Sequence, residues 1–211
     1  MNDLRNNDIA VFDLDGTITK KDTYIEFIKF FRGNFAYYYG IFILSKYIFL
    51  FYMKIYSNDK LKEKFFTYFF KGFRASDVEK KGIEFSENVL PSLCFSSAIN
   101  ILNWHKEKKH DILILTASSD IWLEHWCTKN GFRLICTKFE KIDNVFTGKI
   151  NGLNCFGIQK KVLLEEFLKN NNYTSSFGYG DSLSDKYFLE LVNHPYLMAL
   201  NDENSIKYWR P

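Results

Sequence analysis

The sequence contains little proline and no paired cysteine motif. Only three prolines occur in 211 residues, and there is no internal repeat or Pro/Gly-rich linker, so the chain fits one large domain or a core with a smaller insert. The four cysteines (Cys94, Cys127, Cys136 and Cys155) form no CxxC pair, which predicts reduced, mostly buried thiols in a cytoplasmic protein. The first ten residues, MNDLRNNDIA, hold no apolar stretch of the signal-peptide type, so nothing there indicates secretion.

Strong charge of one sign is also missing. The formal net charge of +3 is too small to indicate a nucleic-acid partner, so none is expected. Aromatic side chains, in contrast, are abundant: they make up 18% of the chain, with 22 Phe and 13 Tyr. They supply ample material for a core, and they also suggest an amphipathic surface somewhere on the molecule.

Short apolar segments alternate with helical segments over much of the chain. Strands are predicted at residues 8–12, 112–115, 134–137, 176–180 and 196–200, with a small hairpin arm over 145–150 around Thr147 and Gly148. Helices are predicted at residues 96–108, 121–130 and 160–170. This alternation predicts an α/β fold, in which a parallel sheet carries helices on both faces.

Residues 22–90 contain no clear strand signal. They predict several helices, broken near Gly33, Gly40, Ser57–Asn58 and Gly72. This block interrupts the alternation after the first strand, so it is interpreted as an inserted α-helical cap. The predicted organisation is a catalytic core of residues 1–19 and 96–211, with the cap at 20–95.

Polar residues follow several of the predicted strands. Asp13 and Asp15 end the first strand in IAVFDLDGTIT, and Thr116-Ala117-Ser118 ends the second. The carboxyl ends of parallel strands meet at one edge of a sheet, which is where ligands bind in such folds. Two carboxylates this close raise the free energy of ionising each other, and a bound cation is the usual compensation.

The same edge receives three more chemical groups. Asp181 ends the strand near residue 178, Asp185 follows it, and Lys160 opens a helix. Each alone is explained by a turn, a helix cap or a solvated surface, but their joint occurrence at strand ends is not. Carboxylates suit Mg²⁺, and a hydroxyl and an ammonium can hold the oxygens of a phosphoryl group.

These residues carry a resemblance to a known family. FDLDGTIT resembles the first motif of the haloacid dehalogenase superfamily of phosphatases, ILTAS the second, Lys160 in CFGIQKKV the third and GYGDSLSD the fourth. TGKINGLNCFGIQKKVLLEEF is similar to the phosphoserine-phosphatase-like branch, and within it to phosphatidylglycerophosphatase C and its uncharacterised relatives. The resemblance spans nearly the whole chain and implies a Rossmann-like core with a helical cap.

The resemblance implies catalytic roles for the first motif. Asp13 is expected to be the nucleophile that forms an aspartyl-phosphate, and Asp15 the acid that protonates the leaving group and then activates water. Thr17 is expected to orient Asp15 or to cap the following helix. Dehalogenases of the superfamily lack the second aspartate, so Asp15 argues against that branch.

The resemblance also implies a metal site and a phosphate site. Mg²⁺ is expected on Asp13, Asp181 and Asp15, the last through its backbone carbonyl, with Asp185 as a further ligand or an orienting group. Thr116, Ala117 and Lys160 are expected to bind the phosphoryl oxygens, with Lys161 as the alternative lysine. Thr116 stands where the branch more often has Ser, and Ser184 where phosphoserine phosphatases usually have Asn, which puts phosphoserine in doubt as the substrate.

The predicted function is a Mg²⁺-dependent phosphomonoester hydrolase, and several alternatives stay open. A phosphotransferase or a receiver-like phospho-aspartate switch would use similar residues. The substrate is either a small phosphomonoester or a lipid phosphate such as phosphatidylglycerol phosphate. Asp22, Lys20, Lys21, Arg32 and Arg74 are the polar candidates for substrate contacts from the cap.

The segment FAYYYGIFILSKYIFLFYM, residues 35–53, bears on that choice. It is nineteen residues long with a single charge, and as a helix it would be about 28 Å long, close to the thickness of a bilayer core. The favoured interpretation is one or two buried cap helices. An interfacial helix that makes peripheral membrane contact at the cytoplasmic face is the second, and a transmembrane span the third.

Overall fold

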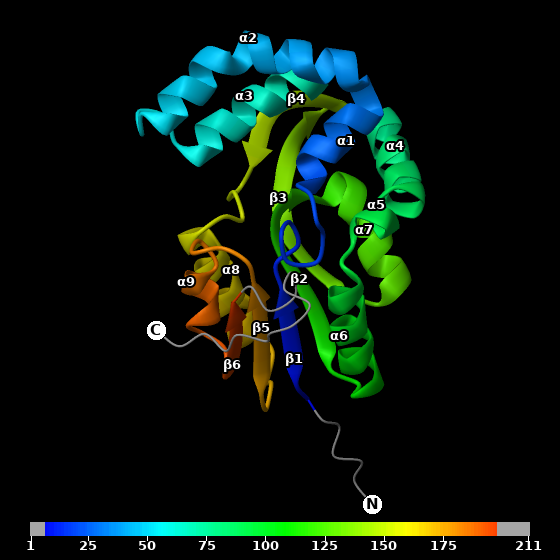
Figure 1. Ribbon diagram of the computed structural model, residues 1–211, viewed down its shortest axis with the longest axis vertical. Coiled ribbons are helices and arrows are strands. Elements are labelled where there is room, and N and C mark those ends of the chain that lie inside the picture. The colour runs from blue at the N-terminus through cyan, green and yellow to red at the C-terminus, as the bar shows by residue number, and fades with distance from the viewer. Residues whose placement is uncertain (1–6, 198–211) are drawn as a thin grey trace, which may run out of the picture.

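The computed structural model describes residues 7–197, whose core is a six-stranded sheet with the order β4-β3-β2-β1-β5-β6 (Figure 1). Neighbouring strands pair in parallel except β4, which pairs antiparallel with β3 at the edge. The strands are β1 (Ile9–Phe12), β2 (Asp111–Ser119), β3 (Arg133–Ile142), β4 (Val145–Asn151), β5 (Ser176–Gly180) and β6 (His194–Leu197). The predicted α/β class with a parallel sheet is confirmed.

Alternating side chains of the central strands build a core on each face of the sheet. On β1, Ala10 and Phe12 belong to a cluster with α6 (Ser96–Glu107) and α7 (Asp120–Asn130). Ile9 and Val11 belong to a second cluster with α8 (Ile158–Lys169) and α9 (Lys186–Leu189). Because successive side chains of a strand point to opposite faces, four apolar residues in a row are what a strand covered on both faces requires.

Two strand predictions need correction. The hairpin turns at Asp143 and Asn144, which have φ values of 50° and 62°, and not at Thr147 and Gly148, which lie within β4. Asn and Asp tolerate the left-handed conformation better than most residues, which explains why this pair forms the turn. The last predicted strand begins at residue 194, and its positions 198–200 lie outside the described residues.

Five helices separate β1 from α6 and lie beyond the carboxyl ends of the parallel strands (Figure 1). They are α1 (Thr23–Arg32), α2 (Asn34–Tyr52), α3 (Asn58–Phe70), α4 (Ala75–Asn88) and α5 (Leu90–Leu93). The predicted break at Gly40 is wrong, because α2 runs through it without interruption. Gly40 is buried, and a Cβ there would lie 2.4 Å from the ring of Phe69, so its small size allows α2 to pack closely on α3.

The β3–β4 hairpin extends from the sheet into this helical layer. The hydroxyl of Thr67 on α3 donates to the carbonyl of Gly148 on β4 at 3.0 Å. The rings of Phe66 and Phe139 stack with their centroids 3.4 Å apart. The layer therefore rests on strands that belong to the core sheet, and we propose it as the cap while its boundaries at 20–95 stay a prediction.

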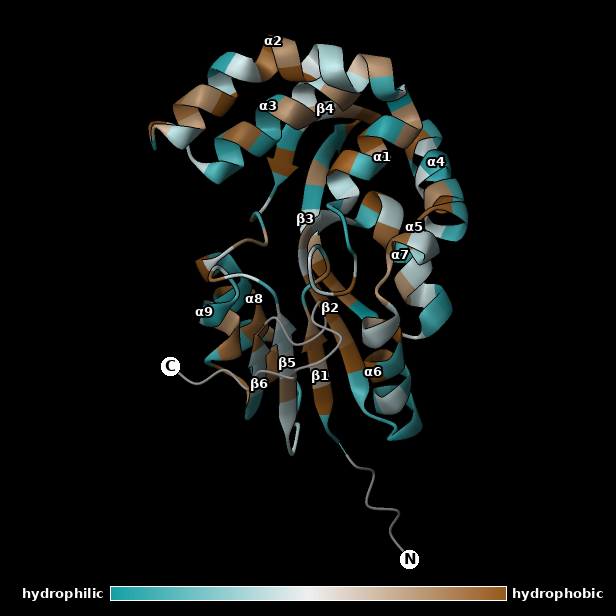
Figure 2. Cartoon of the chain, in the orientation of Figure 1, coloured by the Kyte–Doolittle hydropathy of each residue, from teal (hydrophilic) through white to brown (hydrophobic). Residues whose placement is uncertain are grey.

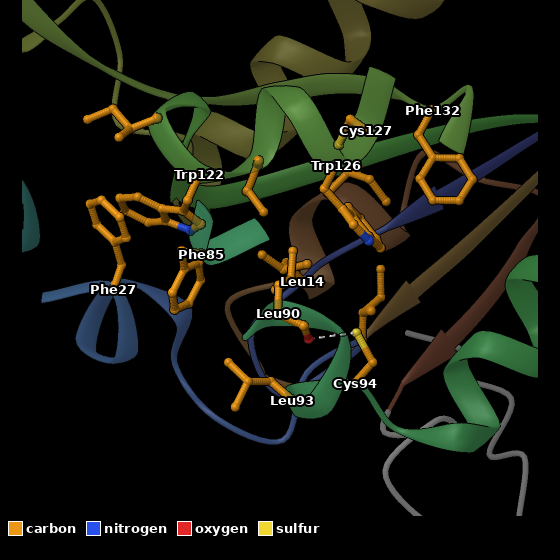
Figure 3. Packing of buried hydrophobic residues seen from close by; sticks show 14 of the residues in the cluster. Leu14, Phe27, Phe85, Leu90, Leu93, Cys94, Trp122, Trp126, Cys127 and Phe132 are labelled. Atoms are coloured by element: carbon orange, nitrogen blue, oxygen red, sulfur yellow. Dashed lines mark hydrogen bonds between the residues drawn. The ribbon is translucent and has the colours of Figure 1, made fainter. Parts of the chain in front are cut away.

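The helical layer and the sheet share one hydrophobic cluster (Figure 3). Trp122 of α7 is fully buried, and its ring stacks on Phe27 of α1 with the centroids 4.8 Å apart. A Cβ on Gly82 of α4 would lie 1.8 Å from the carbonyl oxygen of Ile121, so α4 and α7 are in backbone contact there. On this side the cap is thus continuous with the core.

Helix α2 forms the outer edge of the molecule, where Figure 2 shows apolar residues along its length. Only Gly40 and Leu44 of its nineteen residues are buried, so the expectation of buried cap helices is wrong for this segment. The helix buries one narrow face on α1 and α3 and leaves the rest uncovered. By length and composition it is the single helix within residues 7–197 that could cross a membrane, with 11% of the candidate span buried.

Candidate active site

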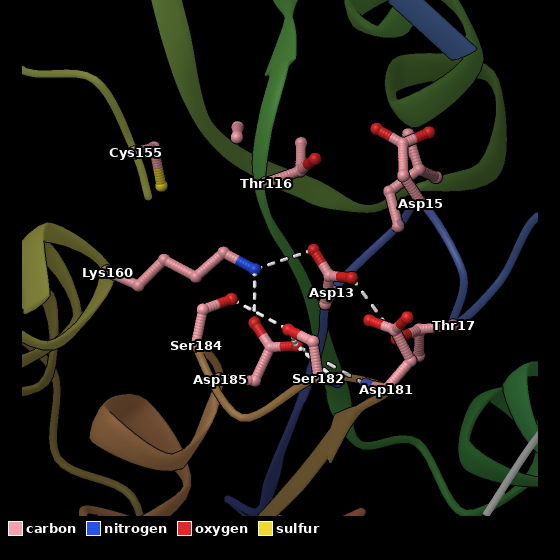
Figure 4. A network of polar contacts seen from close by, with 12 residues as sticks. Asp13, Asp15, Thr17, Thr116, Cys155, Lys160, Asp181, Ser182, Ser184 and Asp185 are labelled. Atoms are coloured by element: carbon pink, nitrogen blue, oxygen red, sulfur yellow. Dashed lines mark hydrogen bonds and ion pairs between the residues drawn. The ribbon is translucent and has the colours of Figure 1, made fainter. Parts of the chain in front are cut away.

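The predicted polar groups meet at the carboxyl ends of β1 and β5 (Figure 4). The ammonium of Lys160, in the first turn of α8, donates to Asp13 Oδ1 at 2.6 Å and to Asp185 Oδ1 at 2.7 Å. All three side chains are buried. Lys161 instead points outward and pairs with Glu190 at 3.4 Å. The structure therefore places Lys160, and not Lys161, in the acidic cluster.

Asp13 directly follows β1 and is held from two sides. Its Oδ2 accepts a hydrogen bond from the hydroxyl of Thr17 at 3.2 Å, so Thr17 contacts Asp13 instead of Asp15 and does not cap α1. The tight turn after the strand turns the chain back and brings these side chains together. Burial raises the pKa of Asp13 to about 7, against the opposing attraction of Lys160.

Asp13, Asp181 and Asp185 form a compact carboxylate group. Each offers an oxygen, and the three oxygens lie within 4.8 Å of one another. Asp185 Oδ2 accepts from the backbone N–H groups of Asp181 at 3.3 Å and Ser182 at 3.1 Å, which fixes its orientation. Burial, followed by repulsion from Asp13, raises the pKa of Asp181 to about 7.

This donor set fits a divalent cation. Three carboxylates face one ammonium, so acidic side chains outnumber basic ones here, and burial raises the pKa of both Asp13 and Asp181. Gly16 makes the arrangement possible, because a Cβ at that position would lie 2.1 Å from Asp181 Oδ2. Its φ of +87° also favours glycine. The carboxylate of Asp15 does not belong to this group.

The Asp15 carboxylate has a different environment from that of Asp13. Its Oδ2 accepts from the hydroxyl of Ser118 at 2.5 Å, and its Oδ1 accepts from the backbone N–H of Thr23 at 2.7 Å. Burial raises the pKa of Asp15 to about 6, with a further contribution from Asp22, while the hydrogen bonds from Ser118 and Thr23 oppose this shift. The carboxylates of the two aspartates thus lie in separate hydrogen-bond networks, and the pKa of each is raised.

The second motif lies between these networks. Thr116 is buried within β2, which extends past its predicted end at residue 115, and its Oγ1 accepts from the N–H of Ser118 at 3.0 Å. The register of β2 against β3 shifts between Thr116 and Ser119. The carbonyl of Ala117 accepts from the ammonium of Lys62 at 2.6 Å, so a residue of α3 is held directly over the motif.

A cavity of about 210 Å³ joins the predicted groups. Its walls from the core are Asp13, Asp15, Thr116, Ala117, Phe156, Lys160, Asp181, Ser182, Ser184 and Asp185. The cap contributes Asp22, Asn58 and Lys62. Asp22, predicted only as a candidate substrate contact, also accepts from the N–H of Ile25 at 3.0 Å and so caps α1.

Sequence reasoning missed several residues of this site. Lys62 and Asn58 are not predicted as site residues, and Ser118 is predicted to lie at the end of the second strand without a role of its own. Lys62 is one of three lysines at alternate positions of α3. Which of them lines the cavity depends on the orientation of α3 about its own axis. Of the other cap candidates, Arg32 donates to the carbonyl of Phe69 at 3.0 Å, and Lys20, Lys21, Arg32 and Arg74 do not line this cavity within the described chain.

The chain belongs to the haloacid dehalogenase-like hydrolases, whose family model matches residues 10–190. It is similar to protein CicA of Caulobacter vibrioides, with 26% identity over 88% of this chain and 83% of that protein. It is also similar to a probable phosphatase of Mycobacterium tuberculosis, with 24% identity over 95% of this chain and 73% of that protein. The predicted family is therefore confirmed, and the protein is a hydrolase.

Solved structures confirm the fold. A Bordetella pertussis protein of unknown function superposes with a TM-score of 0.76 and 20% identity, covering 90% of this chain and 89% of that one. A substrate-bound phosphoserine phosphatase superposes with a TM-score of 0.62 and 15% identity, covering 90% and 85%. A Rossmann-like core with a cap is thereby established, and the similarity to phosphatidylglycerophosphatase C stays a prediction.

Proposed function

We propose that the protein is a phosphomonoester hydrolase that works through an aspartyl-phosphate. The observation that carries this proposal is the pair of environments around the first motif. Asp13 is held by Lys160 within the carboxylate group, and Asp15 lies in a separate hydrogen-bond network with a pKa near 6. Two of the similar proteins support the same chemistry. One is described as a probable phosphatase, and the other is a phosphoserine phosphatase solved as an analogue of the phospho-aspartyl intermediate.

In this proposal Asp13 attacks phosphorus while the bond to the ester oxygen breaks, and Asp15 gives its proton to the departing alkoxide. Asp15, now ionised, then takes a proton from a water molecule while the oxygen of that water attacks the phosphorus. The bond between phosphorus and Asp13 breaks, which releases inorganic phosphate and regenerates Asp13. Lys160 and the hydroxyl of Thr116 hold the phosphoryl oxygens. Asp15 needs to be protonated for the first step and ionised for the second, which a pKa of about 6 permits.

Mg²⁺ is the cofactor we propose, held by Asp13 and Asp181 with Asp185 as a ligand or as the group that orients them. When bound, it supplies positive charge that allows an anionic nucleophile to approach an anionic ester. The ligand atoms are all carboxylate oxygens, which supports this choice over a softer metal. We place the backbone carbonyl of Asp15 among the ligands on the resemblance alone.

The alternatives use the same groups differently. A receiver-like switch keeps its aspartyl-phosphate, whereas a second aspartate with a raised pKa close to the first supports a role in its breakdown. A phosphotransferase would deliver the phosphoryl group to an alcohol in place of water, which the product distinguishes. Phosphoserine is a weaker candidate than other esters, because Ser184 stands in the fourth motif and contacts Ser182 at 2.7 Å.

Hydrolysis of p-nitrophenyl phosphate tests this proposal. We expect turnover with Mg²⁺, none with chelator, and a loss of roughly four orders of magnitude or more in Asp13→Asn, because the nucleophile is removed. Mass spectrometry of acid-quenched enzyme should show a phosphoryl adduct on wild type and none on the variant. Near-wild-type turnover by Asp13→Asn overturns the assignment.

We further propose that α2 makes peripheral contact with an anionic membrane surface, at its cytoplasmic side. The uncovered face is defined by Phe35, Tyr38, Tyr39, Phe42, Phe49 and Tyr52, and each of these side chains is more than half exposed. The surrounding segment is basic as well: residues 29–71 hold eight Lys or Arg and two Asp or Glu. An aromatic face beside excess positive charge is what binding to anionic lipid requires.

Vesicle sedimentation tests the membrane contact. We expect binding to vesicles of phosphatidylglycerol and phosphatidylcholine, weaker binding to phosphatidylcholine alone, and loss of binding in the double variant Phe42→Ser and Phe49→Ser. Self-association of the wild type in the absence of lipid, removed by the same double variant, would instead show that the face binds a second copy. Binding would make a lipid phosphate such as phosphatidylglycerol phosphate the favoured substrate over a small soluble ester.

A further inference from the structure

The ammonium of Lys62 reaches the cavity from the cap and is anchored there by two neutral oxygens. It donates to the carbonyl of Ala117 at 2.6 Å and to Asn154 Oδ1 at 2.8 Å. An ammonium has three N–H donors, and these two bonds use two of them. Because Lys62 lines the cavity, the third donor is left for a group inside it. Both anchors lie on the core, although Lys62 itself belongs to α3.

Asn154 fixes the position of this ammonium. The amide is buried, and its Oδ1 accepts from Thr137 at 2.9 Å in addition to Lys62. Its Nδ2 donates to Asn58 Oδ1 at 2.9 Å and to Asp59 Oδ1 at 2.7 Å. An amide has two lone pairs and two N–H donors, so every one of them is used. The side chain therefore has one favourable orientation, and it joins the start of α3 to the core.

The charge on Lys62 has no carboxylate partner within 4 Å among the described residues. Burial lowers the pKa of Lys62 to about 8, and the carboxylates that oppose this most strongly are Asp22 and Asp15. Lys160, in contrast, is paired with Asp13 and Asp185. Lys62 is anchored on Ala117, and the hydroxyl of the next residue, Ser118, donates to Asp15. Lys62 therefore lies on the Asp15 side of the cavity, where a leaving group that receives its proton from Asp15 has to lie.

We propose that Lys62 is a specificity-determining residue that binds a second anionic group on the alcohol part of the substrate, and that Asn154 is its positioning residue. The preferred esters then carry a carboxylate or a phosphodiester a few carbons from the phosphate. The proposal rests on the proposed phosphatase function. It follows from a partly desolvated ammonium that has one free donor and is anchored by neutral oxygens, because such a group gains most from an incoming anion.

Two three-carbon esters provide the test, since 3-phosphoglycerate carries a carboxylate and glycerol 3-phosphate carries no second charge. We expect Lys62→Met to lower the ratio of their kcat/KM values by roughly tenfold or more, mainly through KM, because one charge-assisted hydrogen bond is lost. Lys62→Arg should restore part of the ratio. Lys60→Met, which removes an exposed charge from the same helix, should leave it at the wild-type value.

A third substrate separates the two sources of negative charge. Short-chain phosphatidylglycerol phosphate carries a phosphodiester, and whichever of the two anionic esters loses more in Lys62→Met identifies the group that Lys62 binds. Esters that turn over too slowly are measured as competitive inhibitors of p-nitrophenyl phosphate hydrolysis. Asn154→Ala should produce the same change in the ratio, again through KM and not kcat, whereas a purely structural role would lower the kcat of every ester alike.

The outcomes separate the two proposals. Equal losses of kcat/KM for the charged and uncharged esters in Lys62→Met overturn the role of Lys62 and leave the phosphatase proposal standing. Absence of wild-type turnover on every ester, p-nitrophenyl phosphate included, overturns the proposed function and this inference with it. A ratio that falls equally in Lys60→Met shows a general effect of surface charge and also overturns the assignment.

Discussion

The carboxylate site and helix α2 depart from ordinary burial in opposite directions. At the site, Asp13, Asp185 and Lys160 are removed from water although they carry charge. On α2, Phe35 and Phe42 remain in water although they are apolar, with 86% and 73% of their surface exposed. Both arrangements are unfavourable for folding alone, which agrees with the binding partners proposed above: a phosphate and a cation at the site, and a lipid surface on α2.

After the loss of the nucleophile in Asp13→Asn, the largest effect is expected at Asp15. In Asp15→Asn we expect hydrolysis of an alkyl phosphate to fall by roughly 10²–10⁴-fold, because the poor leaving group loses its acid. p-Nitrophenolate leaves without protonation, so its release should continue as a burst of about one equivalent, followed by slow breakdown of the phosphoenzyme. Stopped-flow absorbance at millisecond resolution measures the burst.

Wild-type pH profiles provide the control for that experiment. With the alkyl ester, a rate limited by protonation of the leaving group should fall as the pH rises through about 6, where Asp15 loses its proton in the free enzyme. With p-nitrophenyl phosphate this fall should be absent. Identical profiles for the two esters would assign Asp15 a role other than that of an acid.

Lys160 and Lys161 form a matched pair of neighbours, one buried and one partly exposed. We expect Lys160→Met to lower the free energy of unfolding by about 3–5 kcal/mol, because it leaves Asp13 and Asp185 buried without their cation. Lys161→Met should change it by less than about 1 kcal/mol, because its pair with Glu190 is at the surface. Urea denaturation measures both variants, and equal effects would contradict the placement of Lys160.

The order of the motifs made this site predictable, because the carboxyl ends of parallel strands coincide in space wherever they occur in the chain. Asp13, Thr116 and Asp181 could therefore be brought together without coordinates. Lys160 was chosen over Lys161 from its spacing to Cys155 and Gly157, and the structure places it in the cluster. Local pattern determined these positions because each lies directly at a strand end or helix start.

Features that depend on packing between distant segments could not be predicted in this way. The orientation of α3 about its axis determines that Lys62, among the lysines of this helix, lines the cavity. No neighbouring residue in the sequence distinguishes Lys62 from the others. The direction of Thr17 depends on how the turn after β1 closes, and the short spacing allowed either aspartate as its partner. The exposure of α2 depends on how much surface α1 and α3 offer, which an apolar sequence does not reveal.

The next effect is smaller and concerns Asp181. Its pKa of about 7 in the folded state lies above the ordinary value of an aspartate, so between those two pH values the folded state holds a proton that the unfolded state releases. This contribution to stability is present at low pH and is lost as the pH rises through 7. In the presence of chelator at pH 8, the free energy of unfolding of Asp181→Asn should therefore exceed that of wild type by about 1 kcal/mol or more. This difference should become smaller as the pH falls toward 4.

Addition of Mg²⁺ at pH 8 should make wild type more stable than Asp181→Asn, the opposite of the order expected in chelator. A ligand that binds only the folded state stabilises it, and the variant lacks one carboxylate for the cation, so wild type should gain more than Asp181→Asn. Thermal denaturation with and without Mg²⁺ at pH 8 measures this without any substrate. An equal gain in both proteins would contradict a metal site at Asp181.

The smallest effect on the isolated protein is expected on the outer face of α2. Phe42→Ser together with Phe49→Ser should leave hydrolysis of a soluble ester within about twofold and the free energy of unfolding within about 0.5 kcal/mol, because both rings are mostly exposed. Leu44→Ala, on the buried face of the same helix, should destabilise by about 2–4 kcal/mol. If the exposed pair destabilised the protein as much as Leu44→Ala, the face would already be covered in solution by a second copy. The carboxylate site and the face of α2 would then both be buried in solution, because a second copy of the chain, and not lipid, would cover α2.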